Sequence, residues 1–141
     1  MTPKNSGLLQ TLLLLSSLVA SAAAADVVAI VSSKSTIGSL SKAQVADIFL
    51  GKARQFPDGS AAVPFDLAED LPERDEFYQK LMGKSPAQMK AYWSRIIFTG
   101  RGEPPKTDAS NAEMKKRIAE DPRAIGYIDA KLVDASVRVL F

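Results

Sequence analysis

The stretch Ser41–Gly59, SKAQVADIFLGKARQFPDG, determines how the rest of the chain is interpreted. Ser41 can cap the N-terminus of a helix, and Gln44 three residues later completes a capping box. Gly51 stands where a left-handed helix end favours glycine, and Pro57-Asp58-Gly59 is typical of a tight turn. Three apolar side chains between these signals share one helical face: Val45, Ile48 and Phe49. The stretch therefore predicts a short amphipathic helix that ends at a glycine and leads into a turn.

Apolar runs and capped helical segments alternate along the chain on both sides of this stretch. We expect strands at 26–31, 61–65, 124–128 and 137–141, and a polar loop at 107–111. Further helices are expected after Asp70, Ser85 and Ser110, each of which has Glu or Gln three residues later. The helix after Ser85 has the strongest apolar stripe: Met89, Tyr92, Trp93, Ile96 and Ile97. This alternation predicts an α/β fold with helices on both faces of a small, mostly parallel sheet.

Residues 1–25 have the composition of an export signal. Lys4 precedes an apolar run from Leu8 to Ala20, and Ala23-Ala24-Ala25 offers a small-residue cleavage site. A membrane anchor is the less favoured interpretation, because a spanning helix needs about 20 continuous apolar residues. We therefore expect a signal peptide at 1–25, cleavage near Ala25, a periplasmic location and one domain at 26–141.

The composition excludes several kinds of chemistry. The chain has no cysteine and no histidine, so thiolate zinc sites, Ser-His and Cys-His nucleophiles and imidazole bases are absent. Its 18 basic and 16 acidic residues give a formal net charge of +2, which argues against a nucleic-acid partner. The acidic residues between 66 and 73 lack the spacing of a calcium loop. We therefore expect no enzymatic activity, no metal and no cofactor.

Two blocks of sequence resemble the phosphate-type periplasmic solute-binding proteins of ABC transporters. Asp47–Lys52, DIFLGK, followed by an aromatic residue, an Asp and a Gly, is similar to the family segment DIFLGK…W.DG. Arg123–Tyr127, RAIGY, resembles the family strand GAIGYV, with Arg123 in place of the usual Gly. The resemblance implies one lobe of a type II periplasmic-binding-protein-like fold, in three αβα layers. It also implies a small oxyanion such as phosphate as ligand, and a membrane transporter or receptor as partner.

One loop departs from that family. There, the strand corresponding to 61–65 leads into an Arg and a Ser-Gly-Thr triplet that grip the oxyanion. Here the loop is Asp66–Glu73, DLAEDLPE, which lacks the triplet. Its carboxylates compete with an oxyanion for the helix N-terminus, and Pro72 has no N–H to donate. We interpret the loop as a capped helix start with solvated charges.

Candidate anion-binding side chains come from three loops, because ligands in such folds lie outside the carboxyl ends of strands and near helix N-termini. Ser110 is first a helix cap, and Arg101 has a structural alternative, in which it neutralises the end of the preceding helix. Arg101 also belongs to the segment 98–106, FTGRGEPPK, which is similar to a loop of short, single-lobe relatives. The candidates are Ser32, Ser33, Arg74, Thr99, Arg101 and Ser110.

Two functions follow from these observations. The first is an exported solute-binding-like protein that binds a small oxyanion weakly. The second is a periplasmic interaction or sensor-accessory module that has lost ligand binding. Two-lobed relatives close around their ligand by a hinge. One lobe cannot close on itself, so tight capture would require a partner protein or a second copy, as in a homodimer.

Overall fold

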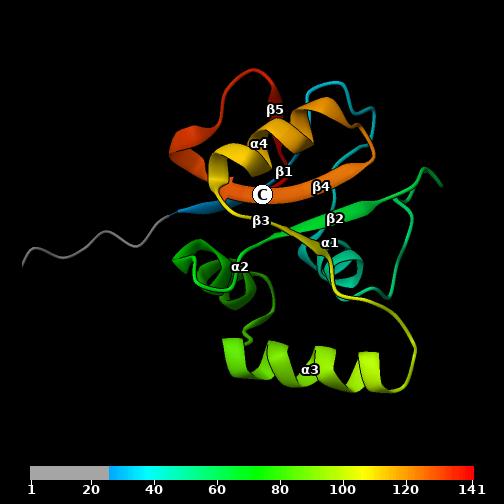
Figure 1. Cartoon of the computed structure of the whole chain (residues 1–141). Helices are drawn as coiled ribbons and strands as arrows, with labels where there is room; N and C mark the ends of the chain where they lie inside the picture. The colour runs from blue at the N-terminus through cyan, green and yellow to red at the C-terminus, as the bar shows by residue number, and fades with distance from the viewer. Residues whose placement is uncertain (1–25) are drawn as a thin grey trace, which may run out of the picture.

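The computed structural model describes residues 26–141, and the expected signal peptide at 1–25 lies outside the described residues. The chain folds into alternating strands and helices (Figure 1). In order, these are β1 (Val27–Ser32), α1 (Lys42–Phe49), β2 (Val63–Leu67), α2 (Pro72–Met82), α3 (Pro86–Phe98), β3 (Lys106–Asp108), α4 (Asn111–Glu120), β4 (Ala124–Asp129), the 3-10 turn η1 (Ala130–Leu132) and β5 (Val137–Val139). Within residues 26–141, no helix has the length and apolar character needed to cross a membrane.

The five strands form one sheet in the order β3-β2-β4-β1-β5. β2 pairs in parallel with β3 and β4, whereas β1 pairs antiparallel with β4 and β5. All strands except β1 therefore point the same way, which confirms the expected mostly parallel sheet. β1 runs antiparallel to both of its neighbours. Its carboxyl end therefore lies at the opposite end of the strands from the carboxyl ends of β2, β3, β4 and β5.

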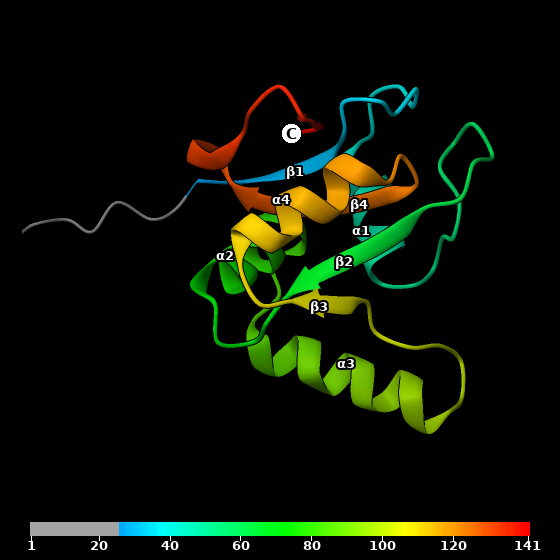
Figure 2. The ribbon, with the colours of Figure 1, turned by 45° about the horizontal axis from the view of Figure 1, so that its top comes forward.

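Helices cover both faces of the sheet, as expected for three αβα layers. Figures 1 and 2 show α4 on one face and α1 with α2 on the other, with α3 farther from the sheet, beyond α1 and α2. Neighbouring residues of β4 face the two layers in turn. Gly126 faces Met114 and Ile118 of α4. Tyr127 faces the other layer, where its ring stacks on Phe77 of α2 with the centroids 3.8 Å apart.

The caps and glycine stops that the sequence predicts are confirmed at most positions. The Ser41 hydroxyl accepts from the Gln44 N–H at 3.1 Å, and the Gln44 side chain accepts from the Ser41 N–H at 2.9 Å. Ser85 and Gln88 form the same reciprocal pair before α3. Gly51 has φ 73°, in the left-handed region that glycine adopts readily.

Two helix starts differ from expectation. α2 begins after Leu71, which has no side-chain cap, and Asp70 does not cap it. Pro72 occupies the first helical position instead, where its fixed φ and missing N–H are compatible with a helix start. Before α4, Ser110 caps Glu113 as predicted, but the Glu113 carboxylate accepts from the Ala109 N–H, one residue earlier than a capping box requires.

The expected strand 61–65 lies two residues further along the chain. β2 ends at Leu67, so Asp66 is part of a buried strand and does not belong to a solvated loop. β3 forms at Lys106–Asp108, where a polar loop was expected, because it pairs with the outer edge of β2. Tertiary pairing overrides the polar composition of this short segment.

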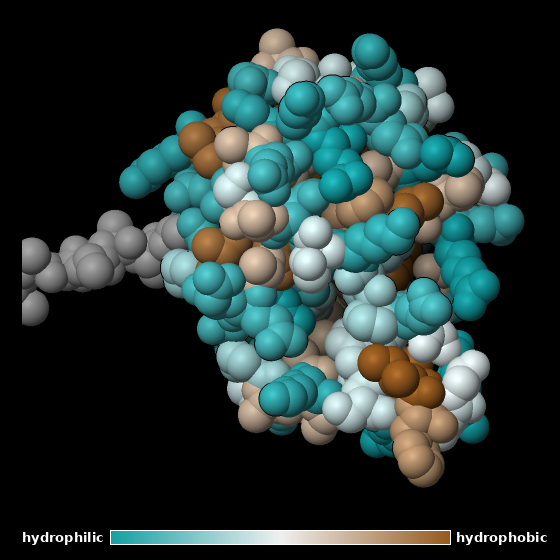
Figure 3. All heavy atoms as spheres, viewed as in Figure 1, coloured by the Kyte–Doolittle hydropathy of each residue, from teal (hydrophilic) through white to brown (hydrophobic). Residues whose placement is uncertain are grey.

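The apolar stripe of α3 is only partly buried. Met89 and Trp93 are buried, whereas Ile97 is 56 % exposed and Phe98, which follows it, is 92 % exposed. Figure 3 shows apolar surface over the C-terminal part of this helix, at the lower right of the view. The helix was predicted correctly, but the rest of the domain buries only some of the apolar side chains that form its stripe.

Gly126 tests the packing of the sheet against α4. A Cβ at this position would lie 2.5 Å from Met114 Sδ and 2.9 Å from Ile118 Cδ1. We expect Gly126→Ala to lower the free energy of unfolding by about 1–3 kcal/mol, because the added methyl group overpacks a filled core. Urea denaturation measures this. The control is Gly38→Ala, where a Cβ meets nothing within 4 Å and a change within about 0.5 kcal/mol is expected. Equal stability of the two variants would contradict the packing described for β4.

Candidate functional site

The most unusual polar group in the described part of the chain is the Asp66 carboxylate on β2, which is only 2 % exposed. It accepts hydrogen bonds from the Leu67 N–H at 2.9 Å, from the Tyr78 hydroxyl at 2.7 Å and from Arg74 Nε at 3.2 Å. The Tyr127 hydroxyl donates to it as well. The donors come from β2, α2 and β4, so one carboxylate joins three elements of the domain.

The electrostatics of this cluster favour a charged Arg74 and two neutral tyrosines, Tyr78 and Tyr127. Burial is the largest single influence and opposes the charge on Arg74, but Asp66, together with Tyr78 and Tyr127, raises the pKa of the guanidinium overall. Burial is also the main cause that raises the pKa of Tyr78 and of Tyr127, and the neighbouring Asp66 carboxylate adds to it. Both tyrosines therefore remain neutral donors to the carboxylate at physiological pH.

Aromatic side chains hold the two tyrosines in place. Phe77 stacks on Tyr127, and Phe49 of α1 meets Phe77 edge-on with the centroids 4.9 Å apart. Tyr78 packs edge-on against the same rings. Such pairs have preferred geometries, so the hydroxyl groups that reach Asp66 are positioned by the core itself.

A second carboxylate is held in a similar way on the neighbouring strand. Asp108, at the end of β3, is 4 % exposed, and its carboxylate accepts from Arg117 Nε and from Arg117 Nη2 at 2.7 Å. The guanidinium carbon also lies 4.6 Å from the centroid of the Phe65 ring. Asp66 and Asp108 lie on the paired strands β2 and β3, so each strand end has its own carboxylate–arginine pair.

Both arginines at this edge are therefore already engaged by carboxylates of the protein. A free oxyanion at these arginines would have to displace the carboxylate of Asp66 or Asp108. Each of these carboxylates belongs to the chain and is held next to the arginine by the fold. The buried tyrosines have raised pKa values, which does not suit them to remove a proton near neutral pH. Within residues 26–141, no group of three or more acidic or other ligating side chains could hold a metal ion.

The structure separates the predicted anion-binding residues. Arg74 and Ser110 lie near the carboxyl ends of β2 and β3, where Arg74 binds Asp66 and the Ser110 hydroxyl caps α4. Ser32 and Ser33 lie at the opposite edge, because β1 runs antiparallel to β4. There the Ser32 hydroxyl donates to the Ala119 carbonyl, and the Ser33 N–H donates to the Ser136 carbonyl.

Thr99 and Arg101 lie apart from both groups, after the end of α3. The Thr99 hydroxyl donates to carbonyls of its own helix at 3.0 and 3.1 Å. Arg101 is exposed and lines a cleft with Ala62 and Pro64, which lie before and at the start of β2. The six candidates thus do not form one cluster, and an anion-binding role for each of them stays a prediction.

Sequence reasoning missed the residues that complete the buried cluster. Nothing in the sequence connects Asp66 with Tyr78 and Tyr127, because the three belong to different elements and meet only in the folded chain. One signal was available: an Asp between two apolar residues, Phe65 and Leu67, in a segment that can form a strand. A buried Asp is rare without a partner, so such a position calls for one.

Comparison with known proteins supports the fold. No protein-family model and no curated protein matches the chain. The structure is similar to a protein assigned as a phosphate ABC transporter substrate-binding protein from Clostridium perfringens, solved with bound phosphate, with a TM-score of 0.65 at 19% identity over 81% of this chain and 43% of that chain. It is also similar to an ABC-type phosphate transport receptor from Vibrio cholerae, with a TM-score of 0.62, 18% identity and coverage of 81% and 44%. For PstS from Borrelia burgdorferi the TM-score is 0.58 and the identity 14%, with coverage of 81% and 46%.

These likenesses define the class of fold. The chain spans less than half the length of each of these solved structures. Residues 26–141 therefore form an α/β domain that corresponds to one lobe of a solute-binding protein. The structural neighbours are substrate-binding proteins and not enzymes. At these identities the likeness shows the fold, and the ligand has to be argued from this chain's own residues.

Asp66 can be tested by removing its carboxylate. We expect Asp66→Ala to lower the free energy of unfolding by about 3–5 kcal/mol, because it leaves Arg74 buried without a counter-charge. Urea denaturation measures the loss. Asp70→Ala is the matched control, since Asp70 is exposed and caps no helix, and a change within about 0.5 kcal/mol is expected. A loss below 1 kcal/mol for Asp66→Ala would contradict the structural role assigned to this carboxylate.

The raised pKa of Tyr78 predicts a loss of stability in alkali. Below pH of about 10 the hydroxyl keeps its proton in the folded and the unfolded chain, so the full stability is present. Above that pH the unfolded chain releases the proton and the folded chain does not, which lowers the free energy of unfolding by up to about 1.4 kcal/mol per pH unit. We expect a shallower decline for Tyr78→Phe than for the wild type between about pH 10 and 11.5, measured by denaturation at each pH. Parallel curves would exclude this linkage.

Proposed function

We propose that this protein is an exported, non-enzymatic module derived from the phosphate-type solute-binding proteins, which acts in the periplasm by docking to a partner and does not carry phosphate itself. The partner would be a membrane transporter or receptor. In this proposal residues 1–25 are a signal peptide that is removed near Ala25, and residues 26–141 are the mature domain.

One observation carries the proposal: the Asp66 carboxylate occupies the donors at the carboxyl end of β2. Ligands of open α/β folds bind outside the carboxyl ends of strands. In this chain a tethered carboxylate already accepts from Arg74 and Tyr78 there. Its local concentration is set by the fold, so a free oxyanion at millimolar concentration competes poorly for the same donors.

The extent of a single lobe also bears on the proposal. Two-lobed binding proteins enclose the ligand by hinge closure, and the enclosed ligand exchanges water for fixed protein donors. One lobe offers donors from one side only, and its ligand stays hydrated on the other. In this proposal, a docking partner or a second copy of the chain supplies the donors of the other side.

A second candidate function is weak binding of an oxyanion by the lobe itself. It is favoured by the fold likeness to a structure solved with bound phosphate. In that case Ser32, Ser33, Arg74, Thr99, Arg101 and Ser110 would contribute donors at separate places, and weak binding is expected.

Calorimetry with phosphate and sulfate separates the two candidates. We expect no saturable heat at dissociation constants below about 1 mM for the wild type, because the donors near Asp66 are occupied. For Asp66→Ala we expect phosphate or formate to raise the melting temperature, since either anion can replace the lost carboxylate between Arg74 and Tyr78.

Each outcome of the following controls favours either the docking role or oxyanion binding. Binding of phosphate to the wild type below 1 mM, weakened at least about tenfold by Arg74→Lys, would overturn the proposal in favour of the second candidate. In a second arm, the wild type is mixed with a two-lobed phosphate-binding protein and with the solubilised transporter of the same cell. Sedimentation should detect a heterocomplex, and a strict monomer in every mixture would contradict the docking role.

A further inference from the structure

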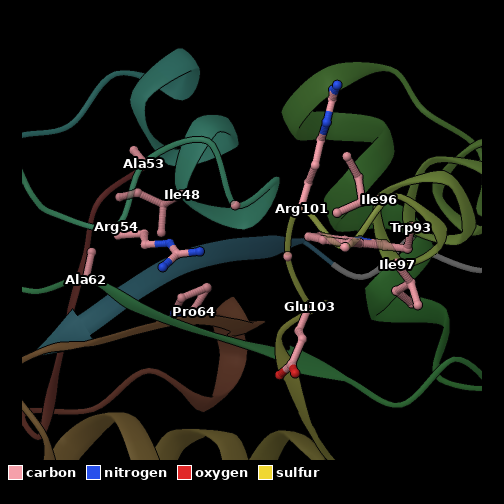
Figure 4. Close-up of a pocket in the computed structure, with 13 residues that line it drawn as sticks. Ile48, Ala53, Arg54, Ala62, Pro64, Trp93, Ile96, Ile97, Arg101 and Glu103 are labelled. Carbon is pink, nitrogen blue, oxygen red and sulfur yellow. The ribbon is translucent and has the colours of Figure 1, made fainter.

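A cleft of about 800 Å³ lies between α3 and the start of β2, away from the Asp66 cluster. Its walls come from three parts of the chain: the end of α1 with the loop that follows it, the first half of β2, and the C-terminal half of α3 with its loop. Figure 4 shows the cleft open between these elements. Its volume is within the range of about 300–1,000 Å³ that is typical of small-molecule sites.

The walls of the cleft are polar and apolar in about equal parts, and the apolar part comes from a few side chains. Ile48 and Trp93 are buried, and Ile96 and Pro64 are half-buried at the lining. Gly51 lies beside Trp93, since a Cβ there would be in ordinary contact with Cη2 at 3.5 Å. A ligand with a hydrocarbon or aromatic body would bury apolar surface against Trp93, Ile96 and Pro64, which inorganic phosphate cannot do.

One cation points into the cleft. Arg54 makes no ion pair and no side-chain hydrogen bond with any residue of 26–141, and in Figure 4 its guanidinium extends into the space between Pro64 and Trp93. Arg101 and Glu103 also line the cleft, but in the same view they extend away from Arg54. The charge available to an occupant is therefore positive.

The loop that carries Arg54 is anchored at several points. The Arg54 carbonyl accepts from the Ala62 N–H at 3.0 Å, and Gln55 forms an isolated bridge with Ala61. Phe56, two residues after Arg54, is 2 % exposed and belongs to the core. The backbone under the arginine is thus held by the fold, although its side chain has no partner.

Trp93, which lines the cleft with part of its ring, also carries a buried polar atom. Trp93 is 6 % exposed, and its indole Nε1 is buried without a hydrogen-bond acceptor among residues 26–141. A buried N–H without an acceptor is unfavourable and uncommon in native proteins. This N–H is enclosed by protein, so the donor that remains available to an occupant of the cleft is the exposed Arg54 guanidinium.

We propose that this cleft binds a small organic anion whose carboxylate pairs with Arg54 and whose apolar body lies against Trp93 and Ile96. A guanidinium can bind both oxygens of a carboxylate at once, which gives such a pair its strength and direction. This site is separate from the phosphate-type edge, so it goes beyond the proposed function and does not depend on it.

The chain contains a single tryptophan, Trp93, which makes its fluorescence a direct probe of the cleft. Benzoate, 3-phenylpropionate and hexanoate are titrated into the wild type, with benzyl alcohol as the neutral probe and inorganic phosphate as the ion without an apolar body. We expect a saturable change with the carboxylates, and binding of benzyl alcohol at least about tenfold weaker than that of benzoate, because it lacks the charged pair with Arg54.

Variants identify the residues that carry the effect. Arg54→Gln should weaken benzoate binding about tenfold or more and leave folding unchanged, because the side chain has no partner to lose. Arg95→Gln is the matched control, an exposed arginine of α3 that does not line the cleft, and no change is expected. Trp93→Phe keeps an aromatic wall, and calorimetry should show that benzoate binding is retained.

Three results would overturn the proposal. These are the absence of a saturable signal with every carboxylate up to about 10 mM, equal affinity for benzoate and benzyl alcohol, and unchanged affinity in Arg54→Gln. Because Asp66 and Arg74 are outside the cleft, phosphate binding that depends on Arg74 has no bearing on this result, and neither outcome decides the other.

Discussion

The burial of one charged group, the Asp66 carboxylate, is the constraint on which this domain depends. A charge in a protein interior is tolerated only when it is paired and hydrogen-bonded. Here the partners are Arg74 and Tyr78 of α2 and Tyr127 of β4. The two tyrosines also belong to the aromatic core. The contacts that pack α2 on the sheet therefore also place the hydroxyl groups that bond to the carboxylate.

This arrangement also shapes what the domain can bind. The carboxyl ends of β2 and β3 form the edge at which an open α/β sheet presents a ligand, and at that edge each strand end is neutralised by its own ion pair, Asp66 with Arg74 and Asp108 with Arg117. Arg54, by contrast, lies at the cleft beside α3 and has no such partner among residues 26–141. The domain thus has the fold of one lobe of a solute-binding protein. Its strand-end carboxylates and arginines are paired with each other, whereas Arg54 at the cleft is not.

Local interactions account for the parts of the fold that could be predicted. Capping boxes at Ser41 and Ser85, and the glycine after α1, were predicted because their partners lie within a few residues. The Asp66 site could not be predicted, since its partners are up to 61 residues apart in sequence. The extent of the buried face of α3 also escaped prediction, because a stripe of apolar residues does not reveal which of them a neighbour will cover.

The sequence by itself determined most of the alternation of strands and helices, most of the helix ends and the α/β class, because caps, glycine stops and apolar periodicity act over a single turn or strand. Only the tertiary structure decided that β1 runs against its neighbours, which places Ser32 and Ser33 at the opposite edge from Arg74. It also decided that Asp66 is buried and Arg54 is not. Strand direction and the pairing of charges depend on contacts between distant segments, and these exist only once the chain has folded.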